Sequence, residues 1–229
     1  MRTDIEIRND VMAELEWQAA ISAYGTKPAE IGVTVKSGIV TLTGTVDRFA
    51  KKNLVEEAAM KIAGVRAIAN DIEVRLSDNY NRNDTDIAEV ILHTLKWNTS
   101  VPEDKIKVKV EDGWITLEGK VEWEFQKTSI EEAVENITGV IGISNMIVVN
   151  SKVPTSDGVK NKIMAAFIRN HYLDANKIKV EISDNTAVLR GQVRNIAEKR
   201  EAERATWFAP GITRVENKLE VESEILHKI

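Results

Sequence analysis

A short pattern that occurs three times constrains the fold of this chain more than any other feature. The segments are KSGIVTLTGTV at 36–46, EDGWITLEGKV at 111–121 and SDNTAVLRGQV at 183–193. Glycine and asparagine landmarks recur at the same two offsets, 75 and then 72 residues: Gly44, Gly119 and Gly191; Gly64, Gly139 and Gly211; Asn70, Asn145 and Asn217. A period of about 70 residues is too long for a solenoid unit and suits a small domain. We therefore predict three tandem modules, at 3–76, 84–150 and 155–223.

Each copy has the same predicted order of elements. An amphipathic helix opens it, with an apolar residue at every fourth position, as at Ile87, Ile91 and Leu95. Two strands with strict apolar alternation follow, joined by a tight turn, and then a second helix that ends at a glycine and a third strand. This αββαβ order predicts an α+β fold, in which each module is a three-stranded mixed sheet with two helices on one face. The asparagine of each third strand is expected to make a structural hydrogen bond to a neighbouring loop.

The triplicated pattern resembles the BON domain (bacterial osmotically inducible and nodulation domain). The resemblance rests on the turn, the V-x-L-x-G strand end, the A/T/P-G-V/I step after the second helix and the N-x-I/L-x-V closing strand, and it covers most of the chain. The third copy departs from it by carrying Asn185 in place of the turn glycine. The resemblance implies modules without catalytic residues, in a family whose members contact phospholipid surfaces or partner proteins, often in periplasmic stress responses or transport-associated settings.

Composition excludes several classes of chemistry. The chain has no cysteine, so disulfides, thiol catalysis and thiolate metal sites are ruled out. The three histidines, His93, His171 and His227, stand at unrelated positions of different copies, which argues against a shared metal site. No nucleotide-binding or nucleophile motif occurs, and a net charge of −5 does not favour nucleic acid. We expect no cofactor, no nucleic-acid partner and no enzyme; a catalytic site built between modules is the remaining alternative.

The N-terminal segment and the distribution of charge bear on the protein's location and surfaces. The segment MRTDIEIRNDVMAELEW has no apolar run of signal-peptide length, and no stretch of the chain reaches the ~18 apolar residues of a membrane span. We expect a cytoplasmic protein, and any association with a bilayer is expected to be peripheral. Residues 154–229 carry 13 basic against 11 acidic side chains, whereas 80–153 carry 8 against 13. Only the third copy has a net positive charge, which fits a basic face or, as the alternative, a solvated surface of mixed charge.

Departures from the repeat are where a functional site is expected. Trp114, in the second strand of the central copy, stands where the outer copies have Ile39 and Thr186. By alternation its side chain lies on the sheet face opposite the helices, together with Met146 and Val148 of the third strand. The outer copies have charged residues in place of those two. Such a face is expected to be covered, by another copy or a second chain, or by a partner protein or lipid surface. A shifted strand register is the third alternative.

Two further aromatic groups are candidate contacts. Trp17 and Trp97 stand near the ends of their first helices, two residues beyond the apolar stripe, where the third copy has Arg169. An aromatic helix end suits an interfacial membrane contact, and packing against the following loop explains it equally well. Trp207 and Phe208 stand at the end of the second helix of the third copy, among basic residues. This position suits contact with an anionic surface or packing between modules.

These observations predict a non-enzymatic binding or adaptor protein of tandem BON-like modules. The family resemblance implies association with anionic phospholipid surfaces in envelope or osmotic stress. The alternative is a protein-interaction scaffold without lipid binding, in which the aromatic side chains hold copies together or mediate self-association. Modules of about 70 residues bury small cores, which favours contacts between them.

Overall fold

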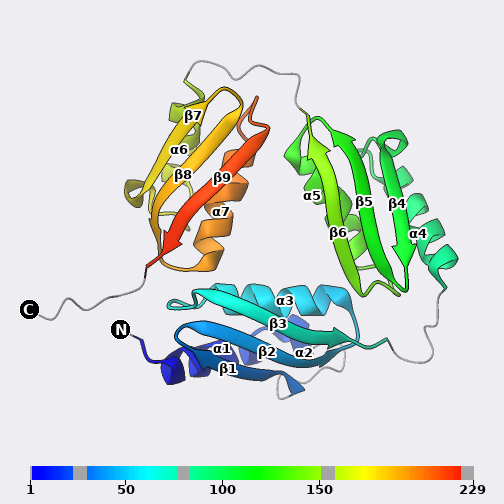
Figure 1. Cartoon of the computed structure of the whole chain (residues 1–229), viewed down its shortest axis with the longest axis horizontal. Coiled ribbons are helices and arrows are strands. Elements are labelled where there is room, and N and C mark those ends of the chain that lie inside the picture. Colours follow the sequence, from blue (N-terminus) through cyan, green and yellow to red (C-terminus); the bar gives the residue numbers. More distant parts are fainter. Residues whose placement is uncertain (1, 23–29, 77–82, 151–157, 223–229) are drawn as a thin grey trace, which may run out of the picture. The chain divides into compact units, whose positions relative to one another are not determined.

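The computed structural model describes residues 2–22, 30–76, 83–150 and 158–222, and it contains three αββαβ modules (Figure 1). We number them 1, 2 and 3 in chain order. The predicted α+β class and the predicted order of elements are confirmed in every module. Within the described ranges, no helix is long and apolar enough to cross a bilayer.

The elements have closely matching lengths in the three modules. Module 1 comprises α1 (Asp4–Trp17), the short α2 (Ala19–Ser22), β1 (Gly32–Lys36), β2 (Ile39–Val46), α3 (Phe49–Met60) and β3 (Ala67–Val74). Module 2 comprises α4 (Asp84–Trp97), the 3-10 turn η3 (Glu103–Lys105), β4 (Ile106–Glu111), β5 (Trp114–Val121), α5 (Glu124–Glu135) and β6 (Gly142–Val149). Module 3 comprises α6 (Val159–Arg169), the 3-10 turn η4 (Ala175–Lys177), β7 (Ile178–Ser183), β8 (Thr186–Val193), α7 (Ile196–Trp207) and β9 (Arg214–Val221).

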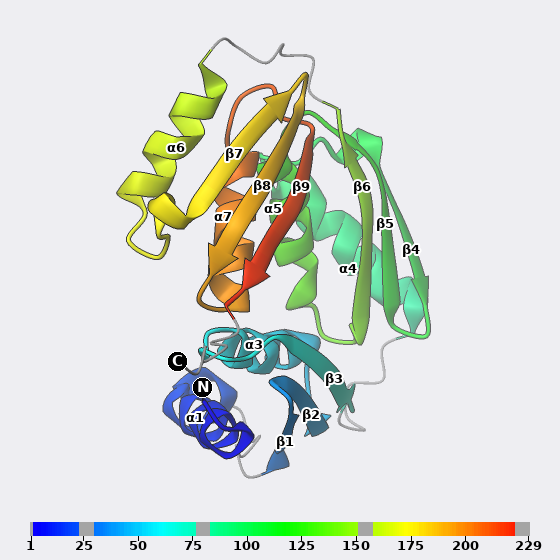
Figure 2. The same cartoon turned by 60° about the vertical axis from the view of Figure 1, so that its left-hand side comes forward.

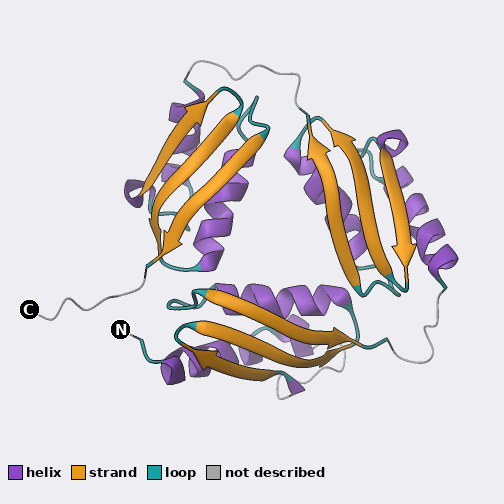
Figure 3. Ribbon diagram, viewed as in Figure 1, coloured by secondary structure: helices purple, strands orange, loops and turns teal. Residues whose placement is uncertain are grey.

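Each sheet has three strands with the second strand in the middle. In modules 2 and 3 the first pair is antiparallel and the second pair is parallel, so the sheets are mixed as predicted. Both helices lie on one face of each sheet (Figure 3). In module 3, α6 packs on β7, and α7 packs on β8 and β9 (Figure 2). The other face of each sheet is left without a helix from its own module.

The core of each module lies between its sheet and its two helices. The predicted stripe of α4, Ile87, Ile91 and Leu95, is buried against Ile115 and Leu117 of the middle strand. The stripes of α1 and α6 are buried in the same way. Removing these side chains from water is the main stabilising term for modules of this size.

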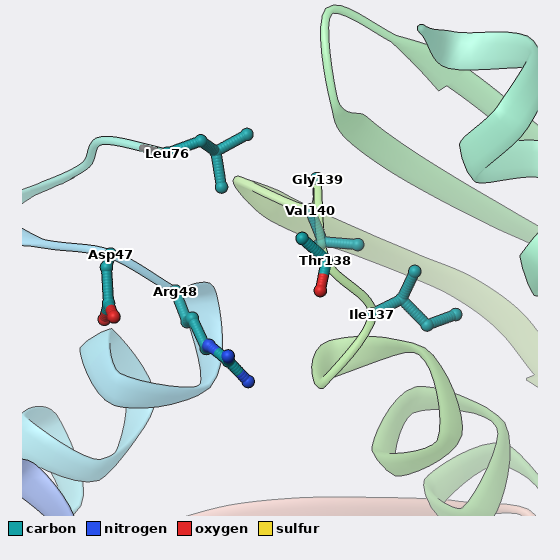
Figure 4. A pocket seen from close by; sticks show the side chains of 7 residues that line it. All are labelled: Asp47, Arg48, Leu76, Ile137, Thr138, Gly139 and Val140. Carbon is teal, nitrogen blue, oxygen red and sulfur yellow. The ribbon is translucent and has the colours of Figure 1, made fainter. Parts of the chain in front are cut away.

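Glycines permit two close approaches in module 2, and module 1 repeats both. Gly119 of β5 has φ +153, and a Cβ atom there would lie 2.3 Å from the carbonyl oxygen of Lys105. Gly139, labelled in Figure 4, has φ +107 in the loop that leaves α5. Its carbonyl oxygen lies 2.6 Å from where a Cβ on Gly113 would stand, so the hairpin turn packs directly on this loop. Glycine is required because a side chain would clash with backbone at both places.

The asparagine shared by the three modules joins the third strand to the second helix. In module 2, Asn145 Nδ2 donates to Glu131 Oε2 of α5 at 2.9 Å, and Asn145 Oδ1 accepts the backbone N–H of Ile147 at 3.2 Å. Asn70 and Asn217 make the same two contacts in modules 1 and 3. The predicted structural hydrogen bond is present, but its partner is a helix and not a loop, because the side chain points inward beneath α5.

Replacing Asn145 with alanine is expected to destabilise module 2 by about 1–3 kcal/mol, because the Ile147 N–H and the Glu131 carboxylate lose a partner in a half-buried place. Hydrogen exchange of the module 2 amides measures this module separately from the other two. Thr128→Ala, at an exposed position of α5, is the control. Unchanged protection of β6 in Asn145→Ala would show that this contact is not needed.

Candidate functional site

The open face of the module 2 sheet carries the three residues predicted for it. Trp114 of β5 is 48% exposed, and Met146 and Val148 of β6 are 61% and 55% exposed. Ile115 and Ile147, their neighbours in sequence, are buried on the helix side. The β5–β6 register keeps the inward and outward sets as alternation predicted, which excludes the alternative of a shifted register.

The indole ring of Trp114 lies across the neighbouring strand. Its Nε1–H donates to Ser144 Oγ at 3.0 Å. A Cβ atom on Gly142 would lie 2.4 Å from Cζ3 of the ring, so the ring covers the backbone of β6 there. Sequence reasoning missed Gly142 and Ser144. The signal was present, because the outer copies have Ala67 and Arg214 at the glycine position, so tryptophan and glycine occur together only in module 2.

The third strands of the outer modules are charged on the corresponding face. In module 3, Glu216 of β9 lies 3.1 Å from Arg214 and 2.8 Å from Lys218. The hydrogen bond and charge of Lys218 lower the pKa of Glu216. Module 1 keeps an exposed Ile39 at the tryptophan position. Glu73 of its third strand, however, points outward and forms an ion pair with Arg75 at 2.9 Å. The combination of exposed tryptophan, methionine and valine is particular to module 2.

The first helices of modules 1 and 2 end in exposed tryptophans. Trp17 is 83% exposed and Trp97 is 74% exposed. Trp97 Nε1 donates to His93 Nε2 at 3.0 Å, one helical turn earlier. The exposed fraction of Trp97 argues against packing on the loop that follows α4. Residues 23–29, which follow Trp17 at a short distance, lie outside the described part of the chain.

Module 3 has an exposed apolar helix end that sequence reasoning missed. Ile168 is 73% exposed and Tyr172 is 62% exposed, on either side of Arg169. The Tyr172 and His171 rings have centroids 3.9 Å apart. Arg169 and Arg204 help to line a hollow of about 400 Å³ beside these rings. The position equivalent to the tryptophans of modules 1 and 2 holds Arg169. The exposed apolar side chains, Ile168 and Tyr172, stand near it and were therefore missed.

A buried carboxylate holds this end of module 3. Glu198 of α7 is 4% exposed; its Oε1 accepts the Asp174 N–H at 2.9 Å, and its Oε2 accepts the backbone N–H of Arg194 at 2.7 Å and its Nε–H at 3.0 Å. Arg194 also donates to the carbonyl oxygen of Tyr172 at 2.7 Å. Burial raises the pKa of Glu198, but the hydrogen bonds from Arg194 and Asp174 outweigh it, so the pKa lies below its ordinary value.

Trp207 and Phe208 differ in exposure. Trp207 is partly buried at the end of α7, whereas Phe208 is 65% exposed. Arg204, one of the basic residues near this helix end, donates from Nε to Glu201 Oε2 at 3.0 Å, so its charge is already paired. Phe208 is thus the exposed member of the predicted pair.

The described side chains offer contact surfaces. Within the described ranges, no three His, Asp or Glu side chains come together as a group that could hold a metal ion. His93 contacts a tryptophan in module 2, His171 contacts a tyrosine in module 3, and His227 lies outside the described residues.

The sequence of each module matches one family model. The BON domain model matches residues 3–75, 83–151 and 155–223, which correspond to the three modules of the structure. The chain belongs to the BON domain family. The resemblance inferred from the repeated motifs is therefore confirmed.

One curated relative and two solved structures show more distant similarity. Over 131 residues the chain is 26% identical to osmotically-inducible protein Y of Escherichia coli (strain K12), covering 56% of this chain and 65% of that protein, just under two thirds of its length. Among solved structures, CdsD, a structural protein of the type III secretion system of Chlamydia trachomatis, is 15% identical, with a TM-score of 0.27 over 94% of both chains. The C-terminal domain of CdsD is 14% identical, with a TM-score of 0.26 over 97% of this chain and 100% of that one. These TM-scores support no inference about fold or function.

Gly142→Ala is expected to displace the Trp114 ring and break its bond to Ser144, because the new methyl group occupies the place of the ring. The indole N–H signal of Trp114 in an NMR spectrum should shift, with a loss of stability of about 1 kcal/mol. Arg214→Ala, at the same position in module 3, is the matched control. An unshifted Trp114 signal in Gly142→Ala would contradict this placement of the ring.

Glu198→Gln is expected to lower the stability of module 3 at neutral pH by roughly 1–3 kcal/mol, because a charged acceptor is lost. Since the folded pKa of Glu198 is depressed, its contribution is present above the unfolded pKa of about 4.5 and is lost as the pH falls through the folded value. Unfolding measured from pH 7 to pH 3 should therefore show the difference between variant and wild type shrinking on acidification. The exposed Glu220→Gln is the control, and a difference independent of pH would refute the assignment.

Proposed function

We propose that this BON domain protein is a non-enzymatic adaptor that associates with phospholipid membrane surfaces through the ends of its first helices. The observation that carries the proposal is the strongly exposed apolar side chain at this place in every module: Trp17, Trp97, and Ile168 with Tyr172. We call these three places the helix tips. They recur although the residues that form them change.

The chemistry of the helix tips suits a bilayer interface. Tryptophan and tyrosine have an apolar ring with one polar group, which matches the boundary between headgroups and acyl chains. Burying on the order of 150 Å² of ring at ~25 cal/mol per Å² contributes about 4 kcal/mol. Several tips on one chain strengthen binding further when they engage together, because later contacts become intramolecular.

The module 3 tip adds a preference for anionic headgroups. Helix α6 contains Lys160, Lys162 and Arg169 and no acidic residue. Arg169 lines the hollow beside Tyr172. Arg169 lies next to the exposed tip, whereas the two lysines lie in the first turn at the other end of α6. Arg169 therefore attracts anionic lipid locally, although the chain as a whole is acidic.

The biological setting is supported by the comparisons. The similarity to osmotically-inducible protein Y supports a role in osmotic stress. The BON domain assignment supports a non-enzymatic role. The cytoplasmic location stays a prediction, which cell fractionation tests.

A second candidate function is a protein-interaction scaffold without lipid binding. The observation that favours it is the exposed Trp114, Met146 and Val148 on a sheet face that also carries charged side chains. A bilayer would have to desolvate those charges, whereas a protein partner can leave them at the rim of a contact.

Co-sedimentation with vesicles tests the membrane proposal. Wild type is expected to sediment with phosphatidylglycerol vesicles, and less with phosphatidylcholine vesicles or at physiological salt, because salt screens the module 3 cations. The triple variant Trp17→Ser, Trp97→Ser and Ile168→Ser is expected to reduce the bound fraction about tenfold, since it removes the apolar contacts.

Met146→Ser is the control, because it removes an exposed apolar side chain away from the tips. Circular dichroism verifies that the variants remain folded. Equal sedimentation of wild type and triple variant, or no sedimentation of wild type, would overturn the membrane proposal and leave the scaffold.

A further inference from the structure

The open face of module 2 is divided into an apolar half and a charged half. The apolar half follows the edge strand β6 and consists of Trp114, Met146 and Val148, which we call the β6 stripe; the Trp114 ring reaches onto β6 through its contacts with Gly142 and Ser144. The charged half follows β4 and β5 and carries Lys107, Lys109, Glu111, Glu118 and Lys120, all exposed. The stripe is therefore one strand wide.

We propose that the β6 stripe is the docking site for an amphipathic α-helix of a partner protein, with acidic residues along the flank that meets the lysines of the face. This goes beyond membrane association at the helix tips and uses a different surface. The proposal rests on the shape of the stripe, on the hydrogen bonding along the edge of β6 and on the charge of the face.

The edge of β6 is poorly suited to pairing with an added strand. Asn145 Oδ1 accepts the backbone N–H of Ile147, so an amide in the middle of this edge strand already has a partner on its own strand. Asn70 and Asn217 accept the corresponding backbone N–H groups in the third strands of modules 1 and 3. A partner is therefore expected to meet the face of β6 and not to extend the sheet.

The dimensions of the β6 stripe fit one helix. From Gly142, beneath the Trp114 ring, to Val148 the strand spans six residue steps, which at about 3.3 Å per residue is about 20 Å. An α-helix covers that length with about 13 residues at ~1.5 Å per residue. A helix presents a narrow apolar stripe of the same kind.

Broader occupants fit less well. A second copy packing sheet against sheet, or a flat bilayer, would cover the charged half as well as the stripe. It would remove Lys107, Glu111 and Glu118 from water together with their neighbours, at a cost in desolvation. A helix lying along β6 leaves these side chains at its rim.

The charge of the face indicates the chemistry of the flank. Lys120 lies directly opposite Val148 in the β5–β6 register, beside one end of the stripe. Lys109 pairs with Glu111 at 2.9 Å, whereas Lys120 forms no ion pair among the described residues. The face has three lysines against two glutamates, although 80–153 as a whole has 8 basic against 13 acidic residues. An acidic flank near Lys120 complements this local excess of positive charge.

Two synthetic helix-stapled peptides of about 14 residues test the proposal. Both carry leucines on one face; one has glutamates along the flanks and the other has lysines. The readouts are the NMR signals of the Trp114 indole N–H and of the β6 amides in the full chain. The glutamate peptide is expected to shift these signals and to bind about tenfold more tightly than the lysine peptide.

Two variants make the test specific. Met146→Asp with Val148→Glu introduces the residues that module 1 carries at these positions, Asp71 and Glu73, and is expected to abolish binding without unfolding module 2. Lys120→Glu is expected to reduce the preference for the glutamate peptide or reverse it. Lys218→Ser with Glu220→Ser, at the equivalent positions in module 3, is the control and should leave binding unchanged.

Several results would overturn the proposal. They are no shift with either peptide, equal affinity for both, shifts that map outside module 2, or binding that survives the change of Met146 and Val148. Phosphatidylglycerol vesicles that shift the Trp114 and β6 signals would assign the stripe to a membrane. A dimer in sedimentation equilibrium that is lost on Met146→Asp would assign it to a second copy. The peptide outcomes do not depend on whether the helix tips bind vesicles, and the vesicle outcome is measured on the triple variant Trp17→Ser, Trp97→Ser and Ile168→Ser, which lacks the apolar contacts of the tips.

Discussion

The contact between the third-strand asparagine and the second helix is the interaction on which the rest of each module depends. Asn145 places an amide in an otherwise apolar row, where the Glu131 side chain and the Lys127 carbonyl oxygen of α5 and the Ile147 N–H satisfy it. A slip of β6 by one residue would turn this amide outward and bury Met146 or Ser144 in its place. The contact therefore sets the register of the strand. By setting the inward row it also determines which residues form the open face.

This division separates scaffold from function. Inward positions repeat across the three modules because each must fill the same core, and glycines such as Gly119 repeat because the backbone approaches too closely for a side chain. Outward positions neither fill the core nor lie where backbones approach closely, so their residues differ between the modules. The third strand is acidic on this face in module 1, ion-paired in module 3 and apolar in module 2. Function in such a protein is expected to lie in these differences.

The two proposed surfaces make different demands on sequence. The helix tips need exposed apolar area near a helix end, and tryptophan or an isoleucine with a nearby tyrosine supplies it, which is why the tips persist while their residues change. The β6 stripe needs a particular geometry: Gly142 makes room for the Trp114 ring, and Ser144 holds its N–H. A membrane tolerates variation in the residues that form the tips. A helix that packs along one strand requires the particular geometry of the β6 stripe.

The sequence by itself determined the three modules, the order of their elements and the face on which each strand residue lies. Helical and strand periodicity are local properties, so Ile87, Ile91 and Leu95 could be placed in the core and Trp114 on the open face. Only the tertiary structure decided which residues meet across strands and helices. It showed that the asparagine bonds to α5, that the Trp114 ring crosses to Gly142, and that Ile168 and Tyr172 form the tip of module 3. These contacts join segments far apart in the chain, or depend on how a side chain turns at a helix end, and no local period encodes them.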